Sequence, residues 1–271
     1  MSHLQRVICL AITGAARSAP QLALETLLNI PPLELQIQAE ARITAHRFQK
    51  LINRNVYSWR KDHSSILKDP VEYEPFLGAP ADRCHPKYIF SRSFKVEIQE
   101  ESTDYGNNGS GDPLTVKWFT DASVNKSGSG YGIYNANTGV SLCGYLGKFT
   151  EITQAELAAI LNCCVEIAND RSSEPIQIFT DSLGALKLLS RPKIESNLVM
   201  DCVQILESIA RTREITIKWT PAHSSSEGNG IADALAKKGA TEIALGPEPF
   251  IFSNEKRCRA TCEKWLQEKK C

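Results

Sequence analysis

The tripeptide Phe-Thr-Asp occurs twice in this chain of 271 residues, ending once at Asp121 and once at Asp181. Each copy closes a short apolar run, at 114–120 and at 176–180, whose composition predicts a β-strand. If the two strands lie side by side and parallel, both carboxylates reach the carboxyl edge of the sheet, where open α/β sheets bind ligands. Two carboxylates at one place repel each other unless a cation lies between them. The repeat therefore predicts a metal-dependent site.

The composition is that of an ordinary globular protein, with 42% hydrophobic and 23% charged residues. The length allows one large domain or two modest ones. The net charge is zero, and no block of the sequence is basic enough to indicate nucleic-acid binding by charge alone. Affinity for a polyanion would have to come from local patches or from bound metal.

The nine cysteines are odd in number and irregularly spaced, which favours free thiols in a reducing compartment. We therefore expect an intracellular protein, with nucleus and cytoplasm both open. The competing interpretation is a secretory signal, since an apolar stretch spans 7–16. Thr13, Gly14 and Arg17 argue against it, and no stretch is long enough to span a membrane, so no membrane partner is expected.

Four segments follow one another along the chain. Residues 1–54 carry two helical patterns, and residues 55–113 read as an irregular linker that ends in a run of Gly, Asn and Ser. Residues 114–240 have the regular alternation of a folded domain. Residues 241–271 are predicted to be a second linker, containing Pro247 and Pro249, followed by a terminal helix.

The domain at 114–240 is predicted to have the element order β-β-β-α-β-α-α-β-α. Short turns join the first three strands, which indicates an antiparallel meander, whereas the strand–helix–strand unit that follows returns parallel. The expected strands are 115–120, 130–135, 142–149, 176–180 and 215–220, and the expected helices are 153–169 (with Thr153 as cap), 181–190, 197–211 and 230–240. This order predicts an α/β fold with a mixed five-stranded sheet, three antiparallel strands and then two parallel ones, flanked by helices.

Four acids occupy places from which they can reach the same edge of this sheet. Asp121 and Asp181 end strands, Glu156 lies near the start of the long helix, and Asp233 lies early in the last helix. Each has a structural explanation when taken alone, as a turn residue or as a favourable charge at a helix start. Together they form a set of hard oxygen ligands suited to Mg²⁺. Four carboxylates can hold two ions about 4 Å apart, the arrangement that hydrolyses phosphodiesters.

His223 follows the third parallel strand in a loop. It can be a solvated loop residue, or it can move protons as product leaves a metal-bound phosphate. A zinc site built from His63, Cys84 and His85 is disfavoured, because their spacing fits no zinc pattern.

Five motifs in order make the segment 114–240 similar to the type 1 ribonuclease H family. They are Phe-Thr-Asp-Ala-Ser (119–123), Gln-Ala-Glu-Leu-Ala-Ala-Ile (154–160), Phe-Thr-Asp-Ser (179–182), Trp-Thr-Pro-Ala-His (219–223) and Glu-Gly-Asn-x-x-Ala-Asp-x-Leu-Ala-Lys (227–237). The resemblance implies a ribonuclease H-like sheet and hydrolysis of the RNA strand of RNA–DNA hybrids. It also implies two Mg²⁺ ions, with Mn²⁺ as a substitute, held by the catalytic acids Asp121, Glu156, Asp181 and Asp233, with His223 as a mobile helper.

The sequence departs from this family at two places. Ala222 stands where many relatives have Gly before the histidine, and three serines follow at 224–226. The basic protruding helix of some members is not evident between Ser190 and Asn197, so hybrid affinity would depend on other parts of the chain.

The flanks resemble the parts around ribonuclease H in the polyproteins of non-long-terminal-repeat retrotransposons. The similarity lies in segments such as 13–20 and 39–45 before the domain, and in Pro247-x-Pro-Phe250 with Trp265 after it. This predicts a reverse transcriptase domain as a partner. The polymerase signature Tyr/Phe-x-Asp-Asp does not occur in the sequence, so DNA synthesis by this chain is not expected.

Two other interpretations stay open from the sequence. One is a catalytically silent hybrid-binding or scaffolding remnant of a retroelement, although all four acids are present. The other is a different nuclease or an integrase of the same fold, against which the Glu-Gly-Asn-x-x-Ala-Asp segment argues.

Overall fold

The structure is a computed structural model that describes residues 2–51, 82–98, 114–170, 172–221, 226–242, 249, 251 and 255–270. The chain divides into two compact units, one formed by Met1–Ala81 with Ser253–Cys271 and the other by Asp82–Phe252. All four predicted acids belong to the second unit. Within the described ranges, no helix combines the length and the apolar character that crossing a bilayer requires.

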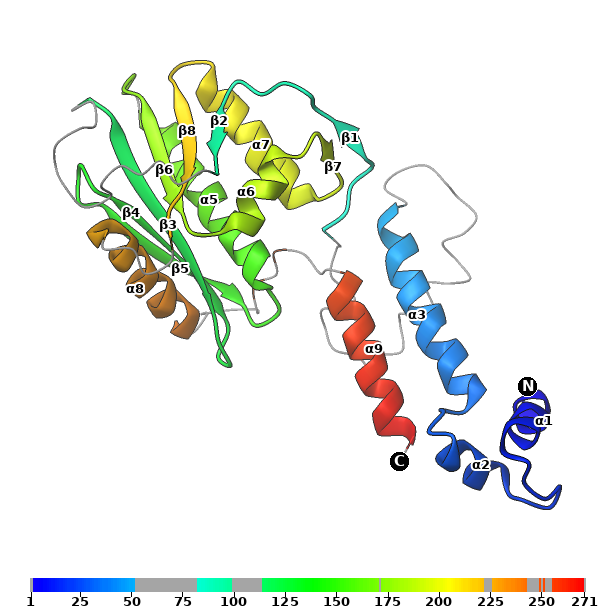
Figure 1. Cartoon of the computed structure of the whole chain (residues 1–271). Coiled ribbons are helices and arrows are strands. Elements are labelled where there is room, and N and C mark those ends of the chain that lie inside the picture. Colours follow the sequence, from blue (N-terminus) through cyan, green and yellow to red (C-terminus); the bar gives the residue numbers. More distant parts are fainter. Residues whose placement is uncertain are drawn as a thin grey trace. The chain divides into compact units, whose positions relative to one another are not determined.

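The first unit is helical, as predicted for the N-terminal segment. It contains α1 (Ser2–Thr13), α2 (Gln21–Leu27), α3 (Leu33–Leu51) and the terminal α9 (Glu255–Lys270). The Gln5 side chain donates a hydrogen bond to the Pro31 carbonyl at 2.8 Å, which ties α1 to the start of α3. Helices α3 and α9 pack together (Figure 1), and the Arg42 guanidinium lies 4.2 Å from the centre of the Trp265 ring.

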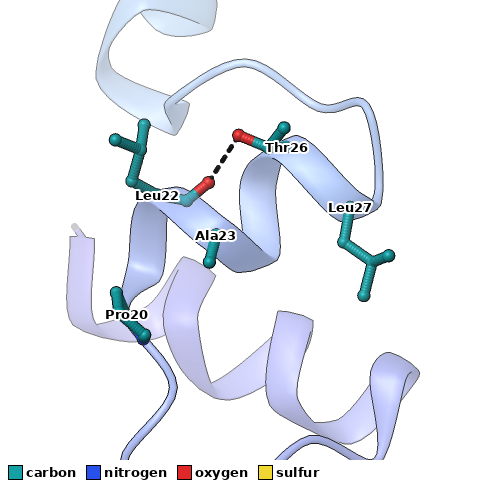
Figure 2. A pocket seen from close by; sticks show the side chains of 5 residues that line it. All are labelled: Pro20, Leu22, Ala23, Thr26 and Leu27. Atoms are coloured by element: carbon teal, nitrogen blue, oxygen red, sulfur yellow. Dashed lines mark hydrogen bonds between the residues drawn. The ribbon is translucent and has the colours of Figure 1, made fainter.

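A depression on α2 contains no titratable side chain. Its lining is Pro20, Leu22, Ala23, Thr26 and Leu27 (Figure 2). The Thr26 hydroxyl donates to the Leu22 carbonyl at 2.8 Å, so the one side-chain polar group of the lining is already engaged within the helix. This depression offers no acid, base or nucleophile for catalysis.

The second unit is built on a mixed six-stranded sheet with the order β2-β8-β6-β3-β4-β5. The strands are β2 (Lys95–Glu97), β3 (Val116–Val124), β4 (Ser129–Asn135), β5 (Ser141–Gly147), β6 (Ile176–Thr180) and β8 (Ile215–Trp219). Strands β3, β4 and β5 form the predicted antiparallel meander, and β6 and β8 run parallel to β3. The predicted fold class is confirmed, and β2 adds a sixth strand, parallel to β8.

Helices cover both faces of this sheet (Figure 1). They are α5 (Ile152–Asn169), α6 (Leu183–Ser190), α7 (Asn197–Ala210) and α8 (Glu227–Thr241). Alternation along β4 separates the faces: Ile133 is fully buried in the main core with residues of α5 and α7, whereas Gly132 faces α8. A Cβ at Gly132 would lie 2.1 Å from the Ala232 carbonyl oxygen, so glycine is what lets α8 lie directly on the strand.

The start of α5 differs in detail from the sequence prediction, which placed the cap at Thr153. The N-cap is Glu151, two residues earlier, and it forms a capping box with Gln154. Glu151 has the extended backbone of a cap residue, and its carboxylate satisfies a free N–H of the first turn.

Part of the predicted irregular linker 55–113 belongs to the second unit; its residues 55–81 and 99–113 lie outside the described residues. We call residues 82–98 the edge segment. It contains β1 (Lys87–Tyr88), which pairs with β7 (Lys193–Ile194), and then β2. Asp82 accepts hydrogen bonds from the Leu198 N–H and from the Ser196 hydroxyl, at 2.9 and 2.8 Å, so it binds the start of α7. Strands of two and three residues are too short to leave a periodic pattern in the sequence.

Replacing Phe94 by Ala is expected to lower the free energy of unfolding by about 3 kcal/mol. Phe94 is only 4% exposed and packs in the main core, so truncation leaves a cavity. The matched control is Phe90→Ala, four residues earlier and 84% exposed, which should change stability by less than about 0.5 kcal/mol. Urea denaturation measures both. Equal effects would contradict the placement of the edge segment in this fold.

Candidate metal centre

The two Phe-Thr-Asp copies lie level in adjacent parallel strands. Strand β3 pairs with β6 in a register that sets Phe119 opposite Phe179, so Asp121 and Asp181 each follow two residues later. Asp181 directly follows the end of β6, as predicted. The prediction that Asp121 ends its strand is wrong, because β3 continues to Val124 through its pairing with β4. The two phenylalanine rings stack with centroids 5.0 Å apart and planes 17° from parallel. The stack and the strand pairing together hold the two chains in this register.

The chain that leaves β6 is held by polar contacts. The Trp219 indole N–H donates to the Asp181 carbonyl at 3.1 Å, and the Thr220 N–H donates to the Thr180 carbonyl at 3.0 Å. Ser182 caps α6 by accepting from the Ala185 N–H at 3.3 Å. The backbone around Asp181 is thereby tied both to β8 and to the start of α6.

Glu156 reaches the same place from α5. It is the fifth residue of this helix and is 5% exposed, and one of its carboxylate oxygens, Oε2, is buried with no hydrogen-bond partner among the described residues. Asp121 is 7% exposed and accepts a hydrogen bond from the Ala122 N–H at 2.7 Å. One carboxylate oxygen from each of Asp121, Glu156 and Asp181 can be chosen so that all three lie within 4.8 Å of one another.

The electrostatics of this cluster are unfavourable without a cation. Burial, and then the charge of Asp181, raise the pKa of Asp121 from 3.8 to about 7. Burial, followed by the charges of Asp121 and Asp181, raises the pKa of Glu156 from 4.5 to about 9. Near neutral pH the metal-free cluster therefore retains protons that a bound cation would displace.

The residues present fit a divalent cation of the hard type. Three carboxylates supply oxygen ligands only, which suits Mg²⁺ and Ca²⁺ better than softer metals. The buried Oε2 of Glu156 is the strongest observation, because an unpartnered carboxylate oxygen is costly in a protein interior unless a ligand satisfies it. The cluster thus has the oxygen donors of a metal centre and a buried carboxylate oxygen that a bound cation would satisfy.

Asp233 lies near this group but outside it. Its charge contributes to the raised pKa of Asp121, yet its Oδ2 is 2.6 Å from the Lys237 ammonium, four residues along α8. Lys237 was not singled out from the sequence, although the spacing of four residues between opposite charges on a helix was a readable signal. Of the four acids predicted for the site, the structure brings three together and leaves the fourth beside them in an ion pair.

Helix α8 is positioned by the packing of its first turn. A Cβ at Gly228 would lie 2.4 Å from the Phe119 ring, so the absence of a side chain permits this close approach. The ring is itself buried against Phe179 and Ala232, which leaves it little room to move. The contact connects Asp233, five residues after Gly228, to the strand that carries Asp121.

Replacing Gly228 by Ala is expected to destabilise the domain by about 1–3 kcal/mol, since the added methyl group overlaps a packed ring. Gly230→Ala is the matched control, because no atom lies within 4 Å of its added Cβ. In the helix interior that control should stabilise by about 0.5–1 kcal/mol. Thermal unfolding of both variants measures the difference, and similar effects at the two positions would argue against the packing described.

His223 lies outside the described residues, as does the whole of 222–225. The structure resumes at Ser226, the N-cap of α8. The role of His223 therefore stays a prediction.

The cysteines form no second centre in the part of the chain that is described. Cys9, Cys84, Cys143, Cys163, Cys164, Cys202 and Cys262 are free thiols. Burial raises the pKa of Cys163 and Cys164 well above the usual thiol value, which keeps them protonated and unreactive. They serve the core, and the intracellular location inferred from cysteine usage stays a prediction.

Comparison with known families agrees with this geometry. The RNase H family model matches residues 113–241, which include the five strands from β3 to β8 in the main sheet, the three clustered carboxylates and Asp233. The edge segment at 82–98 precedes the matched range. An acidic cluster at the carboxyl edge of a mixed sheet, the element order and the family match lead to one conclusion: residues 113–241 are a type 1 ribonuclease H domain.

Proposed function

We propose that this chain cleaves the RNA strand of RNA–DNA hybrids endonucleolytically, by phosphodiester hydrolysis at a two-metal carboxylate site. One observation carries the proposal: three carboxylates from β3, α5 and β6 converge within 4.8 Å inside a domain of a nuclease family. Clustered acids at this density favour metal-assisted hydrolysis over a role in folding, because without a cation they destabilise the protein.

Asp121, Glu156, Asp181 and Asp233 would hold two Mg²⁺ ions, for which Mn²⁺ can substitute. When bound, such ions lower the pKa of a water nucleophile and stabilise the charge on the leaving oxygen. Asp121 lies in β3 and Asp181 directly follows its partner strand β6, so the sheet limits their separation, whereas Asp233 comes from a helix. Lys237 neutralises Asp233 in the metal-free protein, and Asp233 would exchange this partner for a cation.

His223 would move a proton as the product leaves, from a position in the loop between β8 and α8. A neutral imidazole can take a proton and return it near neutral pH, which suits a step repeated in every turnover. Selection of RNA would rest on the 2′-hydroxyl and on the groove shape of the hybrid, without reading the base sequence.

The experiment compares three labelled duplexes of one sequence: RNA–DNA hybrid, DNA–DNA and RNA–RNA. The expected result is internal cleavage of the RNA strand in the hybrid alone, dependent on Mg²⁺ or Mn²⁺ and stopped by chelation. Cleavage that persists in EDTA would overturn the proposal. Tight hybrid binding with no turnover in either metal would instead establish the alternative, a catalytically silent hybrid-binding remnant.

We also propose that the chain works beside a reverse transcriptase domain. The support is the similarity of its flanking segments, such as 13–20 and 39–45, to those around ribonuclease H in retrotransposon polyproteins. Analytical ultracentrifugation of the chain mixed with a non-long-terminal-repeat reverse transcriptase domain tests this idea. Two independent boundaries at micromolar concentrations would contradict it.

A further inference from the structure

The edge segment carries two large aromatic side chains that contribute nothing to the core. Tyr88 and Phe90 are 61% and 84% exposed, and their rings stack with centroids 6.2 Å apart and planes 17° from parallel. Single exposed apolar residues are normal on protein surfaces. Two exposed rings stacked on one short stretch still present aromatic surface to solvent, on which a planar ligand can stack.

The backbone beneath these rings is firmly held. Tyr88 pairs with Lys193 across the β1–β7 ladder, and the Ile89 N–H donates to the Pro192 carbonyl at 2.9 Å. Downstream, the Arg92 guanidinium donates to the Arg191 carbonyl at 2.6 Å. The rings are therefore presented on a fixed support, which reduces the conformational entropy lost when a ligand binds.

The two stretches of chain that meet at the β1–β7 ladder carry an excess of positive charge. Residues 82–93 and 187–195 together contain six Lys or Arg and two Asp or Glu, an excess of four positive charges. Asp82 is engaged at the start of α7, and Glu195 pairs with Lys193 at 3.1 Å. Within the described residues no acidic group lies within ion-pair distance of Lys87 or Arg191, both of which are exposed. We call Lys87, Tyr88, Phe90, Arg191 and Lys193 the aromatic–basic platform.

Helix α6 connects the platform to the metal centre. It begins just after Asp181 and ends at Ser190, directly before Arg191 and β7 (Figure 1). Eight helical residues span about 12 Å. Stacked nucleotides rise about 3.4 Å each, so this length corresponds to about four nucleotides.

We propose that the aromatic–basic platform binds unpaired nucleotides of a substrate strand where it leaves the RNA–DNA hybrid. Exposed rings stack on bases only when those bases are free of a duplex, and Lys and Arg beside the rings contact the phosphates. A duplex without a single-stranded extension would contact the Lys and Arg side chains through its phosphates, and its paired bases would not stack on the rings. This inference rests on the proposed function, because it assumes that the substrate is an RNA–DNA hybrid. It predicts that the preferred substrate is a hybrid that continues into a single strand.

Binding is measured by fluorescence anisotropy, with Ca²⁺ in place of Mg²⁺ to prevent turnover, on a blunt hybrid and on the same hybrid with a single-stranded extension. The extension is expected to improve affinity by about tenfold or more. Tyr88→Ala combined with Phe90→Ala should remove this gain and leave blunt-hybrid affinity unchanged. Both side chains are mostly exposed, so the double variant should fold, which circular dichroism checks.

The cations are tested through the salt dependence of the same binding. Lys87→Ala with Arg191→Ala should reduce the slope of log affinity against log salt for the extended hybrid by about 0.7 per lost phosphate contact. Lys238→Ala is the control, an exposed lysine in the last turn of α8. An unchanged slope in the platform variant would contradict phosphate contacts there.

Cleavage mapping provides a separate readout in Mg²⁺. Wild-type cuts should cluster about four nucleotides from the junction, and the double aromatic variant, compared at saturating substrate, should spread its cuts along the hybrid. Three results would each overturn the platform assignment. The first is equal affinity of the wild-type protein for blunt and extended hybrids, and the second is an equal loss of affinity for both in the double aromatic variant. The third is self-association of the wild-type protein that the double aromatic variant abolishes. An extension effect on binding without any cleavage would support the platform and refute the proposed nuclease activity, so the two failures are distinguishable.

Discussion

Asp121→Asn and Asp181→Asn are each expected to reduce the rate of hybrid cleavage by about 1,000-fold or more. Asn keeps the size of the side chain but removes the negative charge that a hard cation requires. Loss of about 4 kcal/mol of metal-assisted stabilisation in the transition state corresponds to this factor. Single-turnover cleavage of a labelled hybrid at saturating Mg²⁺ measures the effect.

Asp121→Asn should raise the stability of the metal-free protein although it lowers the rate of cleavage. Asp121 is buried beside two other acids, so Asp121→Asn removes a charge that the metal-free fold disfavours. We expect the free energy of unfolding in EDTA to rise by about 2–4 kcal/mol above neutral pH. A variant that loses activity because it unfolds would show a fall instead.

Asp201→Asn is the control for both measurements. This acid lies on α7, is exposed and is no member of the carboxylate cluster. Its replacement should leave cleavage unchanged and shift stability by less than about 0.5 kcal/mol. If Asp121→Asn and Asp181→Asn retain wild-type rates, the two-metal proposal fails.

The second large effect is on the pH dependence of stability in the metal-free protein. The free energy of unfolding is expected to fall as pH rises from about 4 to about 9. A carboxyl group with a raised pKa keeps its proton in the folded state over a range where the unfolded chain has lost it. Because the folded state then binds more protons, it loses stability as pH increases. For Asp121 alone, a rise in pKa from 3.8 to about 7 corresponds to about 4 kcal/mol.

Divalent metal should reverse this trend. A cation that binds only the folded state at 100 times its dissociation constant adds about 2.7 kcal/mol, and binding displaces the retained protons, so the gain grows with pH. Urea denaturation at about pH 5 and about pH 8.5, in EDTA and in saturating MgCl₂, gives the four values needed. Glu156→Gln should reduce the fall in the free energy of unfolding that is expected in EDTA at the high-pH end of this range. A profile in EDTA that is flat or rises with pH would contradict the electrostatic account of the cluster.

The elements of the ribonuclease H domain could be predicted because each is long enough to show its own period. The buried side of α5 leaves a helical stripe. The repeated tripeptide marks both β3 and β6, although β6 ends at Thr180 and β3 continues past Asp121 to Val124. The edge segment could not be found in this way. Its strand β2 has three residues, and its partner β8 lies about 120 positions further along the chain, so nothing local records the pairing.

The residues of the candidate site also divide into those that the sequence predicts and those that it does not place. Asp121, Glu156 and Asp181 were found from element order, since adjacent parallel strands and the helix between them must share one edge of the sheet. The distance of Asp233 from that group was not predictable, because it depends on how closely α8 lies on β3 and β4. That approach is set by missing side chains at Gly130, Gly132 and Gly228.

The sequence alone determined the identity and order of the acids, the elements that carry them and the mixed sheet. The reason is that hydrophobic periodicity and a repeated tripeptide can be read from short stretches of the chain. Only the tertiary structure decided which carboxylate oxygen is left buried without a partner, that Lys237 holds Asp233, and that residues 82–98 support two exposed rings beside β7. The physical reason is that burial, ion pairing and edge-strand pairing are relations between segments far apart in the chain, and their strength depends on distances that no local pattern encodes.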